Sequence, residues 1–487
     1  MKHGVNILMV MKVIGWLLMM ESAFMTIPLL TCVAYGETDF ISFLISIGIT
    51  SIVGAGLTFG LPSGRKDMGK REGFLLTALV WIAFSLFGMI PFIIGSNPLS
   101  LSDAFFESMS GFTTTGASVI SSVESLGRGL LIWRCLMQWL GGMGIILFTL
   151  AVMPMLNHSG GMQMFNAEVT GITHDKIRPR ISQTAKGLWG VYIILTIVLI
   201  GLLWLGPMTF YESVCQGFSA ISTGGFSTAD DSIAHWNSSY IKIVLTIFMF
   251  LGGINFSLMY RAGLGDWKSA LTNDIFKTYI YTVLTVYAIF VVTICLRGQA
   301  DSLSALTIDP MFQIVSVITS TGLSVCDYEI WGSFPLAILF ILMFCGACAG
   351  STSGGAKIDR LLYLFINSKN ELYRCLHPRT MFSVRINGKT VAPEIVSKVI
   401  AFLGIYVILI ISGGIALTAV GLPISDSFFS AFSCISNTGL GIGTANIGCE
   451  FQSIPNIGKW ILSALMLTGR LEIFTVLVLF TPGFWRK

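Results

Sequence analysis

The sequence predicts an all-α integral membrane protein: four tandem repeats of helix, re-entrant pore helix and helix around one central pore, preceded by two extra transmembrane helices. The first observation behind this prediction is composition. Of the 487 residues, 54% are hydrophobic and only 11% are charged, against about 25% charged in soluble globular chains. The second is a series of apolar stretches of spanning length, and the third is a threonine–glycine turn that occurs four times between them.

Apolar stretches long enough to cross a bilayer as helices recur along the whole chain. We expect ten spans, near residues 5–35, 39–61, 72–95, 129–154, 187–206, 240–260, 277–296, 333–349, 395–420 and 459–482. The first is too long for the core of a cleavable signal peptide. Most of the 29 lysines and arginines fall in one set of loops, which are 1–12, 62–71, 155–186, 261–277, 357–398 and 484–487. Because basic loops stay in the cytoplasm, both termini are expected there.

Composition also argues against other classes. The net charge of +4 is too small to suggest a nucleic-acid partner, and the ten scattered cysteines indicate reduced packing thiols. The five histidines lie in polar loops, and no serine, histidine or carboxylate pattern suggests catalysis. We therefore expect neither an enzyme nor a cofactor bound by this chain.

Four outer connections each contain a half-length segment followed by small polar residues. They read DAFFESMSGFTTTGAS (103–118), YESVCQGFSAISTGGFS (211–227), DPMFQIVSVITSTGLS (309–324) and DSFFSAFSCISNTGLG (426–441). We align them on the glycines Gly116, Gly224, Gly322 and Gly439, each preceded by a threonine: Thr115, Thr223, Thr321 and Thr438. An acid lies twelve or thirteen residues before each glycine: Asp103, Glu212, Asp309 and Asp426.

This internal repeat divides the chain into five segments. They are the two extra helices (1–68) and the four pore repeats 69–182, 183–264, 265–390 (which includes a gating loop) and 391–487. One such turn alone would more often be an ordinary interfacial loop. Four at matched positions favour a common function.

Each half-length segment is too short to cross the bilayer, so we expect it to re-enter from the outer face. Non-helical backbone at membrane depth is tolerated only where it is buried in protein or lines water. The acid near each segment's start is expected to cap the helix, and the electronegative carboxyl end then points to the membrane centre, where it favours a cation.

Glycine after threonine permits positive φ, so that successive carbonyls turn toward one axis. Four such turns would form rings of oxygens able to replace the hydration shell of a monovalent cation. The expected ligand carbonyls belong to Thr114, Thr115, Ser222, Thr223, Ser320, Thr321, Asn437 and Thr438, while the four glycines set the geometry. Acids after the turns would concentrate cations at the mouth or are simply scattered loop acids: Glu124, Asp230, Asp231, Asp327, Glu329 and Glu450.

Glycines also interrupt the helix after each turn. For Gly141-Gly142 and Gly252-Gly253 the sequence favours close helix packing; Gly144 and Gly469 mark similar points. The third interruption, CGACAGSTSGGAK (345–357), holds too many glycines and hydroxyls for an intact helix. We expect an unwound loop beneath the filter that acts as an intracellular gate, comprising Gly350, Ser351, Thr352, Ser353, Gly354 and Gly355. Its likeness to a P-loop fails because the lysine comes one place late.

Arg470 lies well inside the last span, where an unpaired arginine is costly and usually faces a cavity. Its charge would slow cation flow without preventing it. The alternative is a structural arginine that bridges carbonyls or pairs with Glu472. Arg134 and Lys242 lie nearer span ends, where they can reach the interface, and are given no role.

The turns TTTGAS, STGGFS, STGLSV and NTGLGI resemble the four degenerate filter turns of the Trk/Ktr potassium-uptake superfamily. GGMGII (141–146), CAGSTSGGAK (348–357) and GRLEIFTVLVLFTPGFW (469–485) are similar to the TrkH-type membrane subunit. The resemblance covers nearly the whole chain. Asn437 departs from it, being more polar than the Thr or Ser of the other turns.

The resemblance implies a homodimeric potassium transporter of the bacterial inner membrane, with a cytoplasmic, nucleotide-binding regulatory subunit of the TrkA/RCK type. It also places Arg470 in the pore below the filter. We expect potassium to enter down its electrochemical gradient through a gated pore. The alternatives are a filter that also passes sodium and a secondary symporter that couples potassium to protons or sodium, although symporters tend to show inverted two-fold repeats. The regulatory subunit is expected to dock on the basic segment 357–398, at Lys369, Arg374, Arg379, Arg385 and Lys389.

Overall fold

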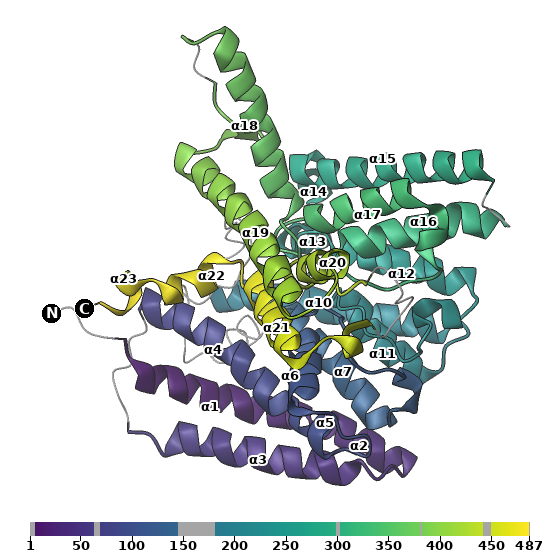
Figure 1. The fold of residues 1–487 in the computed structure, drawn as a ribbon, viewed down its shortest axis with the longest axis vertical. Coiled ribbons are helices and arrows are strands. Elements are labelled where there is room, and N and C mark those ends of the chain that lie inside the picture. Colours follow the sequence, from purple (N-terminus) through teal and green to yellow (C-terminus); the bar gives the residue numbers. More distant parts are fainter. Residues whose placement is uncertain are drawn as a thin grey trace.

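The computed structural model is mostly helical (Figure 1) and describes residues 5–62, 69–144, 181–298, 302–379, 382–441 and 450–486. Its helices are α1 (Ile7–Phe24), α2 (Thr26–Tyr35), α3 (Phe40–Phe59), α4 (Lys70–Gly88), α5 (Ile90–Ile94), α6 (Leu101–Phe112), α7 (Arg128–Gly142), α10 (Ile181–Trp204), α11 (Phe210–Ile221), α12 (Ser239–Gly252), α13 (Phe256–Gly263), α14 (Trp267–Thr272), α15 (Asp274–Arg297), α16 (Leu303–Ile318), α17 (Ser333–Cys345), α18 (Ile358–Leu376), α19 (Pro393–Ala419), α20 (Ile424–Ile435), α21 (Asn456–Arg470), α22 (Phe474–Leu477) and α23 (Pro482–Trp485). A hairpin of β1 (Arg385–Ile386) and β2 (Lys389–Thr390) follows α18.

Six of the expected spans are helices that are long and apolar enough to cross a membrane. They run over Ile7–Tyr35, Phe40–Phe59, Lys70–Ile94, Ala185–Trp204, Asp274–Arg297 and Pro393–Ala419. Several of them have largely open surfaces, with only 22% of the most apolar part of Asp274–Arg297 and 28% of that of Phe40–Phe59 buried inside the protein, whereas Lys70–Ile94 is 56% buried. Because these faces are apolar, they suit contact with lipid. The protein is therefore a multi-pass membrane protein.

The other expected spans are shorter or bent. The α12–α13 pair bends by 102° and the pair of α21 with residues 474–480 bends by 111°. The first bend has a capping cause, since the Asn255 side chain accepts from the Ser257 and Leu258 amides and starts a new helix. The second has a backbone cause, since Glu472 and Ile473 are both left-handed.

The helices α17 and α7 lie in the two remaining expected spans. α17 covers 13 residues of the expected span 333–349. Of the span expected over 129–154, the structure describes α7 and the next two residues; the rest lies outside the described residues. Both of these helices, like α12 and α21, end where the sequence has a glycine-rich interruption.

Four short helices form the buried inner layer of the fold: α6, α11, α16 and α20. In α6 every residue from Ala104 to Phe112 is buried, although the segment is less apolar than the long spans around it. Their starts are capped differently. Thr209 and Glu212 form a capping box on α11, whereas Asp309 lies inside α16, well past the first turn. Ser100, not Asp103, caps α6, and Pro423 stands at the N-cap of α20. The expectation that an acid caps each short helix is therefore confirmed for Glu212 and wrong for Asp103, Asp309 and Asp426.

The ends of the chain and α18 complete the arrangement. The Arg71 side chain at the start of α4 donates to the Arg486 carbonyl (2.8 Å), which brings the end of the chain beside α4. α18 projects from the body (Figure 1), and the hairpin follows it in the chain. The hairpin is fixed to the start of α15 by two reciprocal hydrogen bonds between Asp274 and Asn387 (2.7 and 2.6 Å).

Candidate functional site

Four turns with the same backbone conformation follow the four short helices. In each turn a left-handed residue stands two places before a left-handed glycine. The pairs are Thr114 and Gly116 (φ 55° and 82°), Thr223 and Gly225 (54° and 84°), Ser320 and Gly322 (54° and 78°), and Asn437 and Gly439 (52° and 67°). Left-handed threonine, serine and asparagine are rare, so this recurrence marks a specific shape.

One backbone hydrogen bond anchors each turn to its helix. The amide between the two left-handed residues donates to a serine carbonyl five places earlier. The bonds are Thr115 N to Ser110 O (2.9 Å), Gly224 N to Ser219 O (2.9 Å), Thr321 N to Ser316 O (2.8 Å) and Thr438 N to Ser433 O (3.0 Å). The turns are therefore tied to the carboxyl ends of the helices, where the helix dipole is negative.

The four turns close into a ring. A Cβ built on each left-handed glycine would overlap a carbonyl oxygen of the next turn. These distances are Gly116 to Gly224 O (2.2 Å), Gly225 to Thr321 O (2.0 Å), Gly322 to Thr438 O (2.3 Å) and Gly439 to Thr115 O (2.1 Å). Each turn thus contacts its successor, and the fourth contacts the first. The ring brings together residues from the whole length of the chain.

The expected register of the second turn is wrong by one residue. Gly225, not Gly224, is the left-handed glycine, and Gly224 occupies the place that Thr115, Thr321 and Thr438 hold elsewhere. The two carbonyls matching the expected pairs of the other turns belong to Thr223 and Gly224, while Ser222 is the C-cap of α11.

Two spacings in the sequence indicate the correct alignment of the second turn, on Gly225. Counted to Gly225, the acid of the second segment lies thirteen residues earlier, as in the other three. A serine, Ser219 here, then lies six residues before the glycine in all four segments. The Gly-Gly pair made the alignment ambiguous, and the serine resolves it.

Asn437 does not disturb the turn it belongs to. Its φ of 52° matches that of the corresponding residues. Its amide nitrogen donates to Thr115 Oγ1 (3.0 Å) and to the Met466 carbonyl (2.9 Å). The extra polarity of this residue therefore joins the fourth turn to the first.

A cavity lies against the ring and is lined by all four left-handed glycines. Of the expected mouth acids, Asp230 lines this cavity, and its carboxylate accepts from Ser122 Oγ (2.9 Å) and the Val123 amide (2.5 Å). Glu124 is exposed in the short turn Val123–Ser125, and the half-buried Asp327 caps the turn Tyr328–Trp331. The side chain of Glu450 lies outside the described residues.

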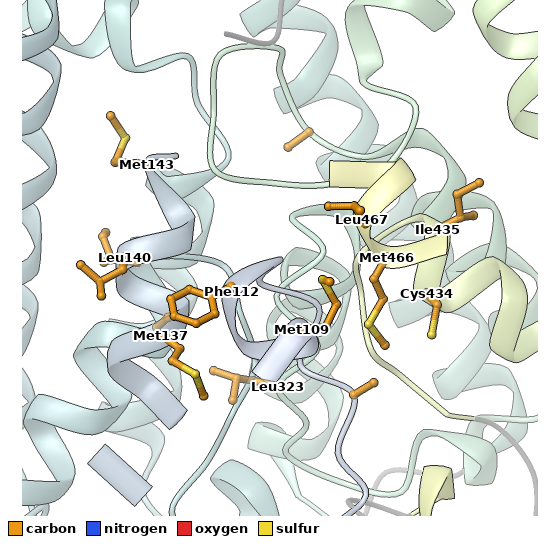
Figure 2. Close-up of a cluster of buried hydrophobic side chains, with 14 of the residues drawn as sticks. Met109, Phe112, Met137, Leu140, Met143, Leu323, Cys434, Ile435, Met466 and Leu467 are labelled. Atoms are coloured by element: carbon orange, nitrogen blue, oxygen red, sulfur yellow. The ribbon is translucent and has the colours of Figure 1, made fainter. Parts of the chain in front are cut away.

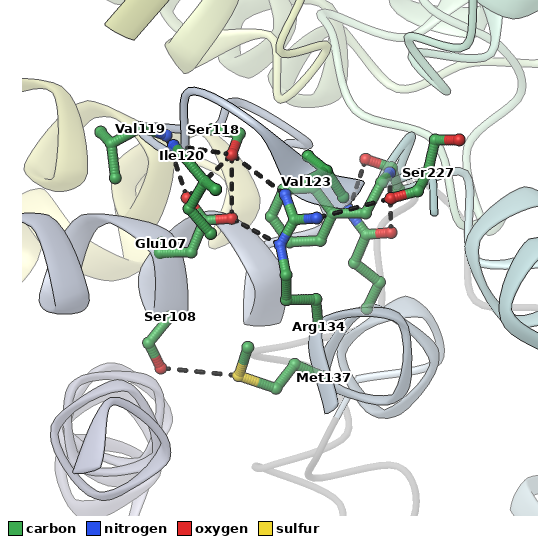
Figure 3. A network of polar contacts seen from close by, with 12 residues as sticks. Glu107, Ser108, Ser118, Val119, Ile120, Val123, Arg134, Met137 and Ser227 are labelled. Atoms are coloured by element: carbon green, nitrogen blue, oxygen red, sulfur yellow. Dashed lines mark hydrogen bonds and ion pairs between the residues drawn. The ribbon is translucent and has the colours of Figure 1, made fainter. Parts of the chain in front are cut away.

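A buried ion pair braces the segments that leave the first and second turns (Figure 3). Arg134 Nε donates to Glu107 Oε1 (2.7 Å), with both side chains almost fully buried. The guanidinium also donates to Ser118 Oγ (3.0 Å) and the Ser227 carbonyl (3.4 Å), while Glu107 accepts from the Val119 amide (3.0 Å). The expectation that Arg134 reaches the membrane interface is wrong, because this carboxylate neutralises it inside the protein.

Two further ion pairs connect neighbouring repeats. Lys242 of α12 binds Asp309 of α16 (2.7 Å), and Lys459 of α21 binds Asp103 of α6 (2.5 Å). In both cases a helix that follows one turn contacts the short helix that precedes the next turn. Lys242 therefore has a structural partner, contrary to expectation.

On the other side of the ring, the segment between α17 and α18 is a non-helical loop, as expected. Gly346, Gly350 and Gly355 are left-handed, and Thr352 and Ser353 are buried. The loop contacts three of the four turns or their helices through three hydrogen bonds: Thr352 Oγ1 to Ile221 O (3.3 Å), Gly354 N to Ser320 Oγ, and Gly355 N to Ser436 O (2.9 Å). It therefore lies directly beneath the ring.

Arg470 bridges this loop to the remaining repeat. Its guanidinium donates to the Thr352 carbonyl (2.8 Å) and to the carbonyls of Gly141 (2.6 Å) and Gly142 (2.8 Å) at the end of α7. The carbonyl bridge that the sequence left as an alternative is thus present. Glu472 pairs with Arg360 of α18 instead (2.5 Å).

Two glycines let α7 and α21 pack closely against the ends of the short helices α6 and α20. A Cβ on Gly141 would lie 1.8 Å from the Phe112 carbonyl, and one on Gly469 would lie 2.0 Å from the Ile435 carbonyl. Figure 2 shows the apolar layer there, to which Phe112, Leu140, Ile435 and Leu467 belong. The glycines at the end of α7 therefore allow close helix packing, as predicted, and they also mark the point where the helix ends.

Comparisons with known proteins cover nearly the whole chain. The family model TrkH, described as a cation transport protein, matches residues 41–277 and 276–487. "Trk system potassium uptake protein TrkH" of Salmonella typhimurium is 35% identical over 98% of this chain and 99% of that protein. "Trk system potassium uptake protein TrkG" of Escherichia coli is 33% identical over 97% of each. The crystal structure of the potassium transporter TrkH from Vibrio parahaemolyticus superposes with a TM-score of 0.89, at 31% identity, over 99% of this chain and 100% of that one.

Proposed function

Because this chain belongs to the TrkH family of cation transport proteins, we propose that it takes up potassium across the bacterial inner membrane through a gated, selective pore. The observation that carries the proposal is the closed ring in which each left-handed glycine abuts a carbonyl of the next turn. Such a ring supplies oxygens that can replace the water around a dehydrated cation. That the cation is potassium is inferred from the potassium transporters to which the chain is similar.

In this proposal residues 1–68 form the two extra helices, and each of the four pore repeats given above contains one short helix. These four helices re-enter the membrane from the outer face. Their carboxyl ends point the negative ends of their dipoles at the ring, which favours a cation there. The ligand carbonyls are those of Thr114, Thr115, Thr223, Gly224, Ser320, Thr321, Asn437 and Thr438. The membrane potential contributes about 2.3 kcal/mol per 100 mV to the entry of each cation.

The loop of residues 350–355 acts as the intracellular gate. Its contacts with three turns and with Arg470 support this role, because together they touch all four repeats. The regulatory subunit of the TrkA/RCK type would carry the nucleotide and act on the loop through α18, which begins directly after it. We further propose a homodimer with both termini in the cytoplasm.

The test is cation flux through purified protein in liposomes. Potassium and rubidium uptake should follow the membrane potential in the absence of any proton or sodium gradient. Flux that appears only with an imposed proton or sodium gradient would establish the symporter instead. Equal sodium and potassium flux would show that the filter does not discriminate between them.

A further inference from the structure

The second turn lacks a side chain that the other three turns have. Where those turns have a threonine, its hydroxyl bonds the hydroxyl two residues earlier: Thr113 with Thr115 (2.8 Å), Thr319 with Thr321 (2.7 Å) and Ser436 with Thr438 (3.0 Å). Gly224 occupies that place in the second turn and cannot form this bond. Another group must hold the turn there.

Gln138 of α7 fills the space beside Gly224. Its Nε2 donates to the Gly224 carbonyl (2.6 Å), and its Oε1 accepts from the Phe226 amide (3.1 Å). The side-chain amide therefore pairs with the turn on both sides of the left-handed Gly225, as a neighbouring strand would. Gln138 is fully buried, so the two hydrogen bonds are sheltered from water.

The same side chain explains why the position is a glycine. The φ of Gly224 lies outside the left-handed region, so its backbone would accept other residues. A Cβ there would meet only Gln138, at 2.4 Å from Cδ, 2.5 Å from Oε1 and 2.8 Å from Cγ among its three nearest atoms. Gln138, not backbone strain, excludes a larger residue.

The corresponding places on two other helices hold methionine. Gly141, Gly252 and Gly469 each approach the last carbonyl of a short helix. Three residues before them lie Gln138 on α7, Met249 on α12 and Met466 on α21. Glutamine thus accompanies the glycine-containing turn, and methionine accompanies turns that contain threonine.

We propose that Gln138 is a positioning residue that replaces the missing threonine of the second turn and holds the Gly224 carbonyl in the ring. The inference rests on the proposed function only where it concerns selectivity. The complementarity between Gln138 and Gly224 stands on the geometry.

The test exchanges the two residues for the combination found in the other repeats. Gln138→Met removes two hydrogen bonds and should lower the potassium-to-sodium flux ratio by at least about fivefold, the value of one net hydrogen bond. Gly224→Thr should abolish selective flux through overlap with Gln138. The double variant Gln138→Met with Gly224→Thr should regain at least about fivefold in the ratio over either single variant. Met137→Leu, one residue along α7, conserves volume and is the matched control.

Melting temperatures measured on the wild type and these four variants separate this inference from the proposed function. A double variant no better than Gly224→Thr in both flux ratio and melting temperature would overturn it. So would a Gln138→Met variant that melts earlier but keeps the wild-type flux ratio. If the wild type itself passed no potassium, the proposed function would fail, whereas a non-additive recovery of melting temperature would still support the exchange.

Discussion

The Arg470 guanidinium donates a 2.8 Å hydrogen bond to the carbonyl oxygen of Thr352, and thereby ties the last long helix of the chain to the loop beneath the ring. Two further bonds to the carbonyls of Gly141 and Gly142 extend the connection to α7. Carbonyls at the end of a helix are negative partners for a cation. Arg470 therefore tethers the loop, and in the proposed pore its charge would also stand on the cation path.

The first prediction is that Arg470→Ala raises potassium flux. A charge about 6 Å from the permeating ion, at an effective dielectric of about 20, opposes it by about 3 kcal/mol, so the gain reaches up to about two orders of magnitude. Arg470→Lys should keep most of the barrier but lose part of the three-carbonyl contact. Liposome flux and melting temperature are measured together. Lower flux with earlier melting in the alanine variant would restrict Arg470 to a structural role.

The loop prediction concerns Thr352, whose hydroxyl contacts the Ile221 and Gly252 carbonyls (3.3 and 3.1 Å). Thr352→Val keeps the side-chain shape and removes this donor, so the loop is held less tightly and basal flux should rise by about fivefold. Deletion within 350–355 should raise it further. Thr293→Val on α15, whose hydroxyl donates to the Ile289 carbonyl of its own helix (2.8 Å), is the matched control. Reduced conductance in a folded deletion variant would place the gate elsewhere.

The left-handed glycines give a third prediction. Gly116→Ala and Gly439→Ala should each abolish selective flux, because the new Cβ would lie 2.2 Å from the Gly224 carbonyl and 2.1 Å from the Thr115 carbonyl. The positive φ adds about 1–2 kcal/mol of strain. Gly190→Ala on α10 is the matched control, since nothing lies within 4 Å of its Cβ. Wild-type potassium flux and selectivity in both ring variants would remove the filter assignment.

Much of this arrangement could be predicted from residue patterns. Hydropathy located the long spans, and the four threonine–glycine turns were found because their spacing repeats. The register of the second turn was missed because two consecutive glycines satisfy the same pattern, and only the spacing to Glu212 and Ser219 distinguishes them. The loop over 350–355 was predicted because no membrane helix tolerates so many glycines.

The polar contacts inside the protein could not be predicted in the same way. Whether Lys242 reaches an interface or a carboxylate depends on which repeat packs beside it, and sequence spacing carries no information on that. The same holds for Arg134 and Glu107, which are separated along the chain by the first turn. Gln138 gave no signal at all, because its role depends on the absence of a side chain at Gly224.

The fourth prediction uses the two ion pairs that connect neighbouring repeats. Asp309→Asn leaves Lys242 poorly compensated with both side chains about one-tenth exposed, and should destabilise the protein by about 3 kcal/mol. Asp103→Asn should cost less, because Lys459 keeps its hydrogen bond to the Gln452 carbonyl (3.0 Å) and the 24% exposed carboxylate of Asp103 is partly solvated already. The exchanged pair Lys242→Asp with Asp309→Lys should recover part of the loss. Melting temperatures in detergent measure all three, and equal melting of Asp309→Asn and wild type would refute the assigned role.

The last prediction concerns docking of the regulatory subunit on α18. The start of α18 is bonded to the loop segment and to the end of α21. Ile358 N donates to the Ala347 carbonyl (3.0 Å), and Arg360 binds Glu472, two residues after Arg470. Farther along, Lys369 lies in the second half of α18, and the exposed pair of Arg374 with Glu371 contributes little stability of its own.

Charge reversal of Lys369 and Arg374 should therefore spare folding while weakening binding of the regulatory subunit by about tenfold, through the loss of complementary charge. Binding and the nucleotide response of potassium flux should fall together, because one continuous element carries the force from α18 to the loop. Lys268→Glu, an exposed reversal on α14, controls for net charge. If binding weakens but the nucleotide response of the bound complex is intact, α18 holds the subunit without moving the loop. If both are unchanged, the docking surface belongs to another cytoplasmic segment, and 155–186 is the next to test.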